Sequence, residues 1–158
     1  MTSQQIVRVE LGDRSYDVVV GPGVRSQIAN VVPASAKRAV IVTQANIPFS
    51  VEDSLVAAGI STRTINIGPG EEFKSLDTIE MIMRECALFG LTRNDVIVGV
   101  GGGMVTDIAG FAASAWHRGI AVVHVSTTLV GMVDAAIGGK TGVNLAEGKN
   151  LVGAFWQP

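Results

Sequence analysis

The chain has 158 residues, a mass of 16.4 kDa and a formal net charge of −2. Its apolar fraction is 47%, its charged fraction is 16% and its mean hydropathy is +0.40, which excludes the disordered, collagen-like and low-complexity classes. The sequence contains no basic block, so nucleic acid is not an expected partner. The length fits one domain with a hydrophobic core of its own.

Neither a membrane span nor a signal peptide is expected. The longest run without a charged residue is Gly119 to Val133, 15 residues, whereas a span needs about 20 apolar residues. Met1 to Val7 has no basic segment followed by an apolar one. The single cysteine, Cys86, cannot form an internal disulfide, which fits a cytoplasmic location, and we expect it in the core.

The first half of the chain predicts a β-hairpin followed by alternating strands and helices. The hairpin pairs a half-buried strand over Ile6–Leu11 with a strand over Tyr16–Val20, across Asp13. Further strands are expected over Ala39–Thr43, Ser61–Ile67, Asp95–Val100 and Ala121–Val125. Helices are expected over Pro48–Ala58, from the N-cap Ser75 to the stop at Gly90, and over Met104–Trp116.

The expected elements predict the fold class. One apolar stripe of the second helix combines Leu76, Ile79, Met83 and Cys86. Strands that alternate with helices indicate βαβ units, and hence an α/β, Rossmann-like fold with a mostly parallel sheet, flanking helices and the N-terminal β-hairpin. After Val130 the pattern becomes glycine-rich and loop-like. Ligands of such sheets bind at the carboxyl ends of the strands.

Charge and glycine are unevenly distributed along the chain. Only six charged residues lie from Val96 onward, against 20 before it, and twelve of the 19 glycines lie between Gly99 and Gly153. Backbone segments can approach closely in such a stretch, and each charge that remains there needs a partner or a function.

Two strand ends carry residues suited to a nucleotide. After Ser61–Ile67, Glu71 could accept ribose hydroxyls and Lys74 could hold an anion; the alternative is a solvated helix entry in which Glu71 favours the helix dipole. Gly101 to Gly103 could admit a pyrophosphate to the helix start that follows. Met104 breaks the G-x-G-x-x-G pattern, and Asp107 in the apolar helix is costly unless it is bonded.

The remaining polar positions lie later in the chain. Ser126, Thr127 and Thr128 could cap a helix or bind a ligand. The glycine-rich stretch beyond them favours a site for a small polyhydroxy anion over a solvated loop, because it combines Asp134, Lys140, Asn144, Lys149 and Asn150. Gly139-Lys140-Thr141 is not a P-loop, since Asp134 stands where that motif needs glycine.

The two histidines favour ordinary structural roles. His117 ends a helix, where an imidazolium suits the dipole, and His124 in an apolar strand is expected to be a satisfied core residue. No cluster of cysteine, histidine and carboxylate has metal-ligand spacing, so no metal ligand is expected in this chain.

The motifs together resemble the 3-dehydroquinate synthases, a family of sugar phosphate cyclases. The segments that carry the resemblance are Gly70–Ser75, Gly101–Phe111, Arg118-Gly119, Thr127–Leu129, Val133-Asp134, Gly138–Asn144 and Gly148–Phe155. The resemblance implies conversion of 3-deoxy-D-arabino-heptulosonate 7-phosphate to 3-dehydroquinate and phosphate, in the shikimate pathway that leads to chorismate and the aromatic amino acids. It also implies that NAD transiently oxidises a ring hydroxyl, which acidifies the neighbouring C–H for phosphate elimination.

The resemblance also implies roles for individual residues. NAD contacts fall on Gly70, Glu71, Lys74, Gly102, Gly103, Asp107, Thr127, Thr128, Lys140 and Lys149. Asp134 would hold a substrate hydroxyl, Lys140 and Asn150 the phosphate end, and Arg118 would reach that site from a neighbouring subunit. Two positions depart from the family pattern: Ser126 replaces a usual proline, and Gln44 replaces an acidic residue near the adenosine.

The family extends beyond the length of this chain. Its helical C-terminal domain, absent here, carries a glutamate and two histidines that bind a divalent metal, zinc or cobalt. We therefore expect residues 1–158 to be the NAD-binding domain with part of the substrate site, inactive alone, weak in NAD binding and with an exposed apolar face. The full-length enzyme would be a homodimer. The alternatives are a related cyclase, an iron-type alcohol or glycerol dehydrogenase, and a non-catalytic nucleotide-binding module.

Overall fold

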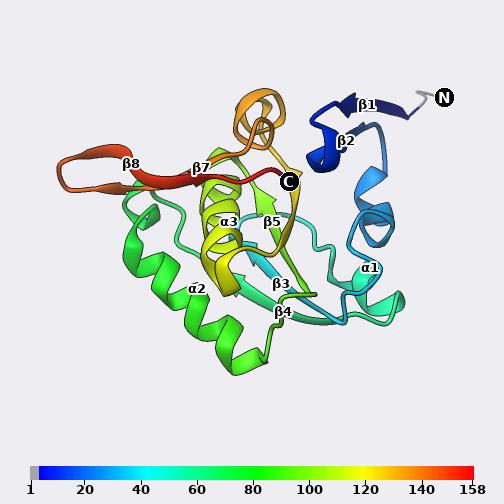
Figure 1. Ribbon diagram of the computed structural model, residues 1–158, viewed down its shortest axis with the longest axis horizontal. Helices are drawn as coiled ribbons and strands as arrows, with labels where there is room; N and C mark the ends of the chain where they lie inside the picture. Colours follow the sequence, from blue (N-terminus) through cyan, green and yellow to red (C-terminus); the bar gives the residue numbers. More distant parts are fainter. Residues whose placement is uncertain (1–3) are drawn as a thin grey trace.

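A computed structural model describes residues 4–158 (Figure 1). The first three residues of the Met1–Val7 segment, for which no signal peptide is expected, lie outside the described residues. The strands are β1 (Gln5–Val9), β2 (Tyr16–Val20), β3 (Arg38–Thr43), β4 (Ser61–Asn66), β5 (Val96–Gly101), β6 (Ala121–Ser126), β7 (Lys140–Leu145) and β8 (Gly148–Phe155). The α-helices are α1 (Glu52–Ala57), α2 (Leu76–Phe89) and α3 (Gly103–Ala115).

A four-stranded parallel sheet forms the centre of the fold. Its order is β4-β3-β5-β6, so the chain crosses over between the strands as βαβ units do. All six residues of β5 are buried, which explains why that strand is a continuous apolar run. The Rossmann-like α/β class with a mostly parallel sheet is therefore confirmed.

Helices cover both faces of this sheet and enclose two hydrophobic cores. On one face α2 and α3 pack on side chains that include Val42, Ile97 and Val122. On the other, α1 and a 3₁₀ helix over Val24–Asn30 pack against Ile41 and Val98. Figure 1 shows α2 and α3 on one side of the sheet and α1 on the other. This covering on both faces leaves the ends of the strands as the places where a ligand can enter.

The second helix follows the expected caps, with a shifted apolar stripe. Ser75 accepts a hydrogen bond from the Thr78 N–H, and Gly90 ends α2 in the left-handed conformation with φ 70°. Cys86 is fully buried, which raises the pKa of its thiol to about 12, so its predicted role in the core is confirmed. The prediction that Leu76 belongs to the buried stripe is wrong, because this residue lies in the first turn and is 45% exposed. Ile82 is buried instead.

The first helix is shorter than expected. The sequence predicts Pro48–Ala58, but α1 begins at Glu52, and just before the helix the Ser50 hydroxyl accepts a hydrogen bond from the Glu52 N–H at 3.0 Å. The residues before it form a bend in which the Ile47 N–H donates to the Gln44 carbonyl. Pro48 therefore lies outside the helix.

The N-terminal hairpin is present but more exposed than expected. β1 pairs with β2 in antiparallel register, from Gln5 opposite Val20 to Val9 opposite Tyr16. Ile6 is 64% exposed and Val7 is 55% exposed, so the expected half-buried strand is wrong. Within the described residues these two strands form a sheet of their own, in which the β1 residues are mostly exposed and Tyr16, Val18 and Val19 of β2 are half-buried.

The stretch after Val130 is ordered, contrary to the loop-like expectation. Gly131–Ala135 forms a π-helical turn, and β7 and β8 form an antiparallel hairpin that packs on α3 (Figure 1). Gly142 and Gly153 face each other there, and a Cβ at Gly153 would lie 2.0 Å from the Thr141 carbonyl oxygen. The glycines therefore permit close contact between two strands, a use that glycine content alone cannot distinguish from a loop.

Exposed apolar side chains gather next to the π-helical turn. Leu129 is 74% exposed and Val133 is 67% exposed, with Val130 and Met132 beside them. This surface agrees with the expected exposed apolar face. Among the described residues, no helix combines the length and the hydropathy that crossing a bilayer requires.

One buried carboxylate joins the amino ends of the central strands. Asp95 is 2% exposed and accepts hydrogen bonds from the backbone N–H groups of Lys37 and Arg38, each at 2.9 Å. It also accepts the N–H and the hydroxyl of Thr92 at 2.7 Å. Burial acts to raise the pKa of Asp95, but these four donors outweigh it and hold the pKa below the ordinary aspartate value.

We expect Asp95→Asn to lower the free energy of unfolding by about 1–3 kcal/mol, because an amide nitrogen would face two of the donors. Since the folded pKa is lowered, the stabilisation is present above about pH 4 and is lost as the pH falls through the folded value. Urea unfolding between pH 3 and 7 measures both effects. The exposed Asp13→Asn serves as the control; equal acid sensitivity in Asp95→Asn and the parent chain would contradict the assignment.

Candidate functional site

Three polar segments meet at the carboxyl edge of the parallel sheet. Gly68–Ser75 follows β4, Gly102 follows β5, and Thr127 follows β6. Gln44, directly after β3, donates its side-chain N–H to the Gly68 carbonyl at 3.0 Å and so holds the first of these segments in place. The topology therefore collects the predicted nucleotide residues at one edge, as parallel sheets do.

Lys74 lies at the centre of this edge and is almost fully buried. Its ammonium is 2.5 Å from the Asp107 carboxylate of α3 and 2.5 Å from the side-chain oxygen of Asn150 in β8. An ammonium can only donate, so Asn150 must turn its oxygen toward Lys74 and its NH₂ group away from it. The ion pair satisfies Asp107 in its apolar helix and points Lys74 inward, toward protein groups.

Asp107 is the electrostatic centre of the edge. Burial raises its pKa above the ordinary aspartate value, and the hydrogen bond and charge of Lys74 oppose that rise. The charges of Asp134 and Glu71 raise the pKa further, so the two carboxylates lie close enough to interact with it. Asp107 is therefore the carboxylate that pairs with the buried ammonium, and Asp134 and Glu71 add negative charge near Asp107.

Asn144 of β7 connects two of the predicted site residues, and the sequence assigns it no separate role. Its side-chain NH₂ donates to Glu71 Oε1 at 2.9 Å, and its side-chain oxygen accepts the Asn150 N–H at 2.8 Å. Lys149 Nζ lies 3.7 Å from the same Glu71 oxygen. These residues border an open groove of about 640 Å³ between the start of α2 and the hairpin. The sequence singles out Asn144 only as one of the polar residues of the glycine-rich stretch, and the structure gives it Glu71 and Asn150 as partners.

Gly102 lies at the start of α3, close to Thr128. Gly102 is half-buried, and a Cβ there would lie 3.0 Å from Thr128 Cγ2. The first N–H groups of a helix have no intrahelical acceptor, so this terminus favours an anionic group such as a pyrophosphate. Thr128 Oγ1 accepts the Gly131 N–H at 3.2 Å, which is a capping role, and the Thr127 N–H donates to Gly101. The residues at this end fit the diphosphate of a dinucleotide.

Asp134 and Lys140 form a second, exposed pair. Lys140 Nζ donates to Asp134 Oδ1 at 2.9 Å, and that hydrogen bond raises the pKa of Lys140 above the ordinary lysine value. The side chains are 60% and 65% exposed, so both are free to exchange each other for a ligand. Gly70 and Gly103 lie with the segments already described, before Glu71 and at the start of α3.

Arg118 is not brought to this edge. It lies before β6, at the amino end of the strand, whereas Thr127 follows the carboxyl end. His117 beside it is exposed.

The buried Nδ1 of His124 has no hydrogen-bond partner among the described residues, so the expectation of a satisfied core histidine is wrong. Desolvation by burial lowers the pKa of His124 to about 4, and the ring is neutral above that pH.

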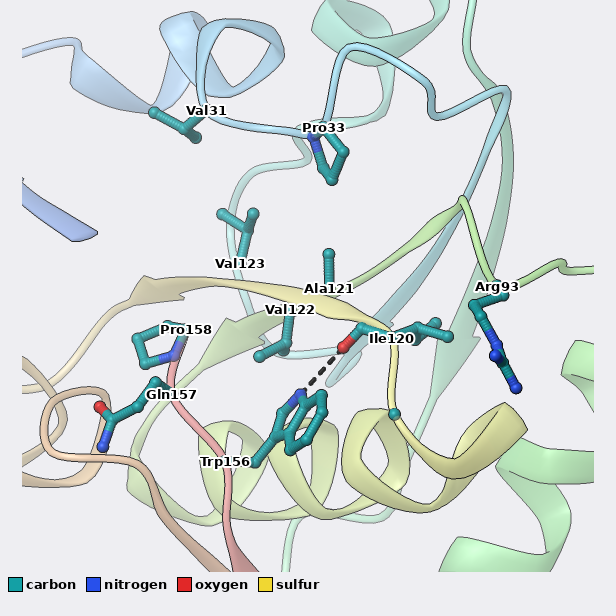
Figure 2. A pocket seen from close by; sticks show the side chains of 11 residues that line it. Val31, Pro33, Arg93, Ile120, Ala121, Val122, Val123, Trp156, Gln157 and Pro158 are labelled. Atoms are coloured by element: carbon teal, nitrogen blue, oxygen red, sulfur yellow. Dashed lines mark hydrogen bonds between the residues drawn. The ribbon is translucent and has the colours of Figure 1, made fainter. Parts of the chain in front are cut away.

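A second hollow lies at the edge strand β6 and is of a different character. It measures about 410 Å³ and is lined mainly by apolar side chains, among them Val31, Pro33 and Val123. Figure 2 shows the Trp156 indole at one side of it, near Val122 and Ile120, and the indole N–H donates to the Ile120 carbonyl at 2.9 Å. Arg93 is the charged residue of its lining. This hollow has none of the hydroxyl and carboxylate groups of the other edge.

In the part of the chain that the structure describes, no three His, Cys, Asp or Glu side chains come together as metal ligands.

The buried Lys74–Asp107 pair gives a stability prediction. We expect Lys74→Met to lower the free energy of unfolding by about 3–5 kcal/mol, because it leaves Asp107 buried without its cation. Adding Asp107→Asn should recover part of the loss, since the uncompensated charge is then gone. Urea unfolding measures both variants, with the exposed Lys37→Met as the control. A loss in Lys74→Met no larger than in that control would show that the pair does not bear on stability.

The family described as "3-dehydroquinate synthase N-terminal" matches residues 64–158. A putative aminodehydroquinate synthase of Amycolatopsis mediterranei is 50% identical over 153 residues, which cover 96% of this chain and 42% of that protein. The 3-dehydroquinate synthase of Saccharopolyspora erythraea is 45% identical over 161 residues, 100% of this chain and 43% of that protein. The chain thus spans about two fifths of the length of these relatives.

Solved structures agree with this placement. A 2-deoxy-scyllo-inosose synthase, solved with carbaglucose-6-phosphate, NAD⁺ and Co²⁺, superposes with a TM-score of 0.84 at 29% identity, over 98% of this chain and 44% of that one. A 2-epi-5-epi-valiolone synthase of Streptomyces hygroscopicus, solved with NAD⁺ and Zn²⁺, gives 0.79 at 34% identity, over 94% and 42%. The family match covers more than half of the chain and includes Lys74 with its partners Asp107 and Asn150. The chain therefore belongs to the 3-dehydroquinate synthase family and corresponds to the N-terminal part of its members.

Proposed function

We propose that the protein carrying this chain converts 3-deoxy-D-arabino-heptulosonate 7-phosphate into 3-dehydroquinate and phosphate with NAD as cofactor. The observation that carries the proposal is the convergence of Asp107 from α3 and Asn150 from β8 on Lys74 at the carboxyl edge of the sheet, with Glu71 joined to Asn150 through Asn144. Residues 1–158 would form the NAD-binding domain with part of the substrate site. The related 2-deoxy-scyllo-inosose synthase was solved with both NAD⁺ and carbaglucose-6-phosphate, which supports this ligand pair.

The residues divide into a nucleotide side and a phosphate side. Glu71 offers a carboxylate for the ribose hydroxyls, next to the cation of Lys149. Gly70, Gly102 and Gly103 let the diphosphate approach the backbone, with Thr127 and Thr128 at the next strand end. When bound, NAD supplies a reversible hydride acceptor; the protein groups hold and orient the reactants around it.

The phosphate side takes its charge from exposed groups. Lys140 is a mobile cation for the phosphate, and Asp134 can accept a substrate hydroxyl in place of the Lys140 ammonium. Asn150 presents its NH₂ group to an anion because Lys74 occupies its oxygen. Arg118 lies at the far end of β6, so it would serve this site only from a second copy of the chain, in a homodimer.

The metal and the cellular compartment in this proposal are taken from what the family implies. The divalent metal, zinc or cobalt, would be bound by residues outside this chain, consistent with the Co²⁺ and Zn²⁺ of the solved relatives. The isolated 158-residue chain would bind NAD weakly and would not turn over substrate, because part of the cleft wall is missing. The reaction would take place in the cytoplasm, in the shikimate pathway.

A calorimetric titration of the purified chain with NAD tests the nucleotide side. We expect Gly102→Val to weaken binding by about tenfold or more, because its side chain would occupy the space beside Thr128 that the diphosphate needs. Ala34→Val, on an exposed loop before β3, is the matched control and should bind as the parent does. Binding unaffected by Gly102→Val would contradict the placement of the diphosphate; absence of turnover with intact binding would fit a nucleotide domain.

A second candidate function differs in the substrate. The 50% identity to a putative aminodehydroquinate synthase favours an amino analogue of the heptulosonate phosphate as the alternative. We expect the full-length protein to release phosphate at least about tenfold faster, in kcat/KM, from the hydroxy substrate than from the amino analogue. A coupled phosphate assay with both compounds decides the matter. Preference for the amino analogue would reverse the assignment, and oxidation of glycerol without phosphate release would favour the dehydrogenase alternative.

A further inference from the structure

The hairpin carries an irregularity at the candidate site. Val143 pairs with Val152 and Leu145 with Gly148, so Asn144 alone stands opposite three residues of β8. Asn150, the middle one, has φ 55°, in the left-handed region that asparagine tolerates better than most residues. Bulges of this kind re-aim side chains next to active sites. The bulge presents Asn150 toward Lys74 and away from the regular ladder.

Asn144 compensates for the missing ladder bonds and uses both ends of its amide. Its oxygen accepts the Asn150 N–H at 2.8 Å, and its NH₂ group donates to Glu71 Oε1 at 2.9 Å. Its backbone N–H donates to the Lys74 carbonyl at 2.8 Å. One half-buried residue thus joins the turn after β4 to both strands of the hairpin.

We propose that Asn144 is a positioning residue that holds the nucleotide-side carboxylate Glu71 with its NH₂ group and the phosphate-side Asn150 with its oxygen. The inference rests on the proposed function, since it takes NAD and phosphate as the ligands of the two sides. It assigns Asn144 no contact with either ligand. Through Glu71, the NH₂ group of Asn144 influences the affinity for NAD. Through Asn150, its oxygen influences the affinity for phosphate.

The chemistry of the amide permits the two halves to be separated. Asn144→Asp keeps an acceptor for the Asn150 N–H but removes the donor and places a like charge beside Glu71. Asn144→Ala removes both. Combining Asn144→Asp with Glu71→Gln reverses the polarity of the bond: the glutamine NH₂ donates to the new carboxylate, and the local net charge stays the same.

The experiment measures the dissociation constants of NAD and of inorganic phosphate in the full-length protein that carries this chain. We expect Asn144→Asp to weaken NAD about tenfold and to leave phosphate within about twofold of the parent. Asn144→Ala should weaken both by about tenfold. In the double-mutant cycle, Glu71→Gln with Asn144→Asp should bind NAD about tenfold more tightly than the product of the single effects predicts. Asn94→Asp, at the amino end of β5, controls for the added charge.

The outcomes separate this inference from the proposed function. The positioning role would be overturned by additive effects in the double-mutant cycle, or by equal losses of NAD and phosphate affinity in Asn144→Asp. In either case the proposed function would stand if the parent protein binds NAD. A parent that binds neither ligand would overturn both. Melting temperatures identify variants that fail to fold; if Asn144→Ala does, the Asp variant and the cycle decide alone.

Discussion

The candidate site depends on one buried ammonium. Lys74 is 5% exposed, and its two polar partners come from a helix and from a hairpin strand far along the chain. A buried cation is stable only when its partners are placed accurately, so the pair with Asp107 requires the turn after β4, the helix α3 and the hairpin to keep one arrangement. The same cation decides which end of the Asn150 amide faces a ligand. The charge of Lys74 thus fixes both the relative position of these three segments and the Asn150 group that a ligand would meet.

Much of the fold could be predicted because its signals are local. The buried run of β5, the Ser75 cap and the left-handed stop at Gly90 each depend on a few neighbouring residues, and each appears as expected. The hairpin β7–β8 could not be predicted from composition, since its glycines serve a contact between strands, which is a tertiary property. The start of α1 differed for a local reason: a turn over residues 44–47 and the hydrogen bond from the Glu52 N–H to the Ser50 hydroxyl precede the helix, and the position of Pro48 did not reveal them.

The site shows the same division between local and tertiary information. Glu71, Lys74 and Asp107 stand out in the sequence because charges are rare next to glycine-rich strand ends, and they lie together in the structure. The orientation of a side chain depends on tertiary contacts, which the adjacent residues in the sequence do not reveal. Lys74 faces inward, and the Nδ1 of His124 has no hydrogen-bond partner among the described residues. Asn144 is predicted only as one member of a polar, glycine-rich stretch, so its connections to Glu71 and Asn150 appear only when the turn and the hairpin are seen side by side.

The carboxylate of Asp95 lies at the opposite end of the same strands from these groups. Each end of the sheet therefore contains one buried charged group that bears on stability, and only the carboxyl end also has groups that could meet a ligand. This arrangement tells protein engineering which residues to leave in place. Loops at the amino edge can be rigidified or fused to another protein to improve handling if Asp95 keeps its donors, and the exposed groups at the carboxyl edge can be redesigned if the Lys74–Asp107 pair is kept.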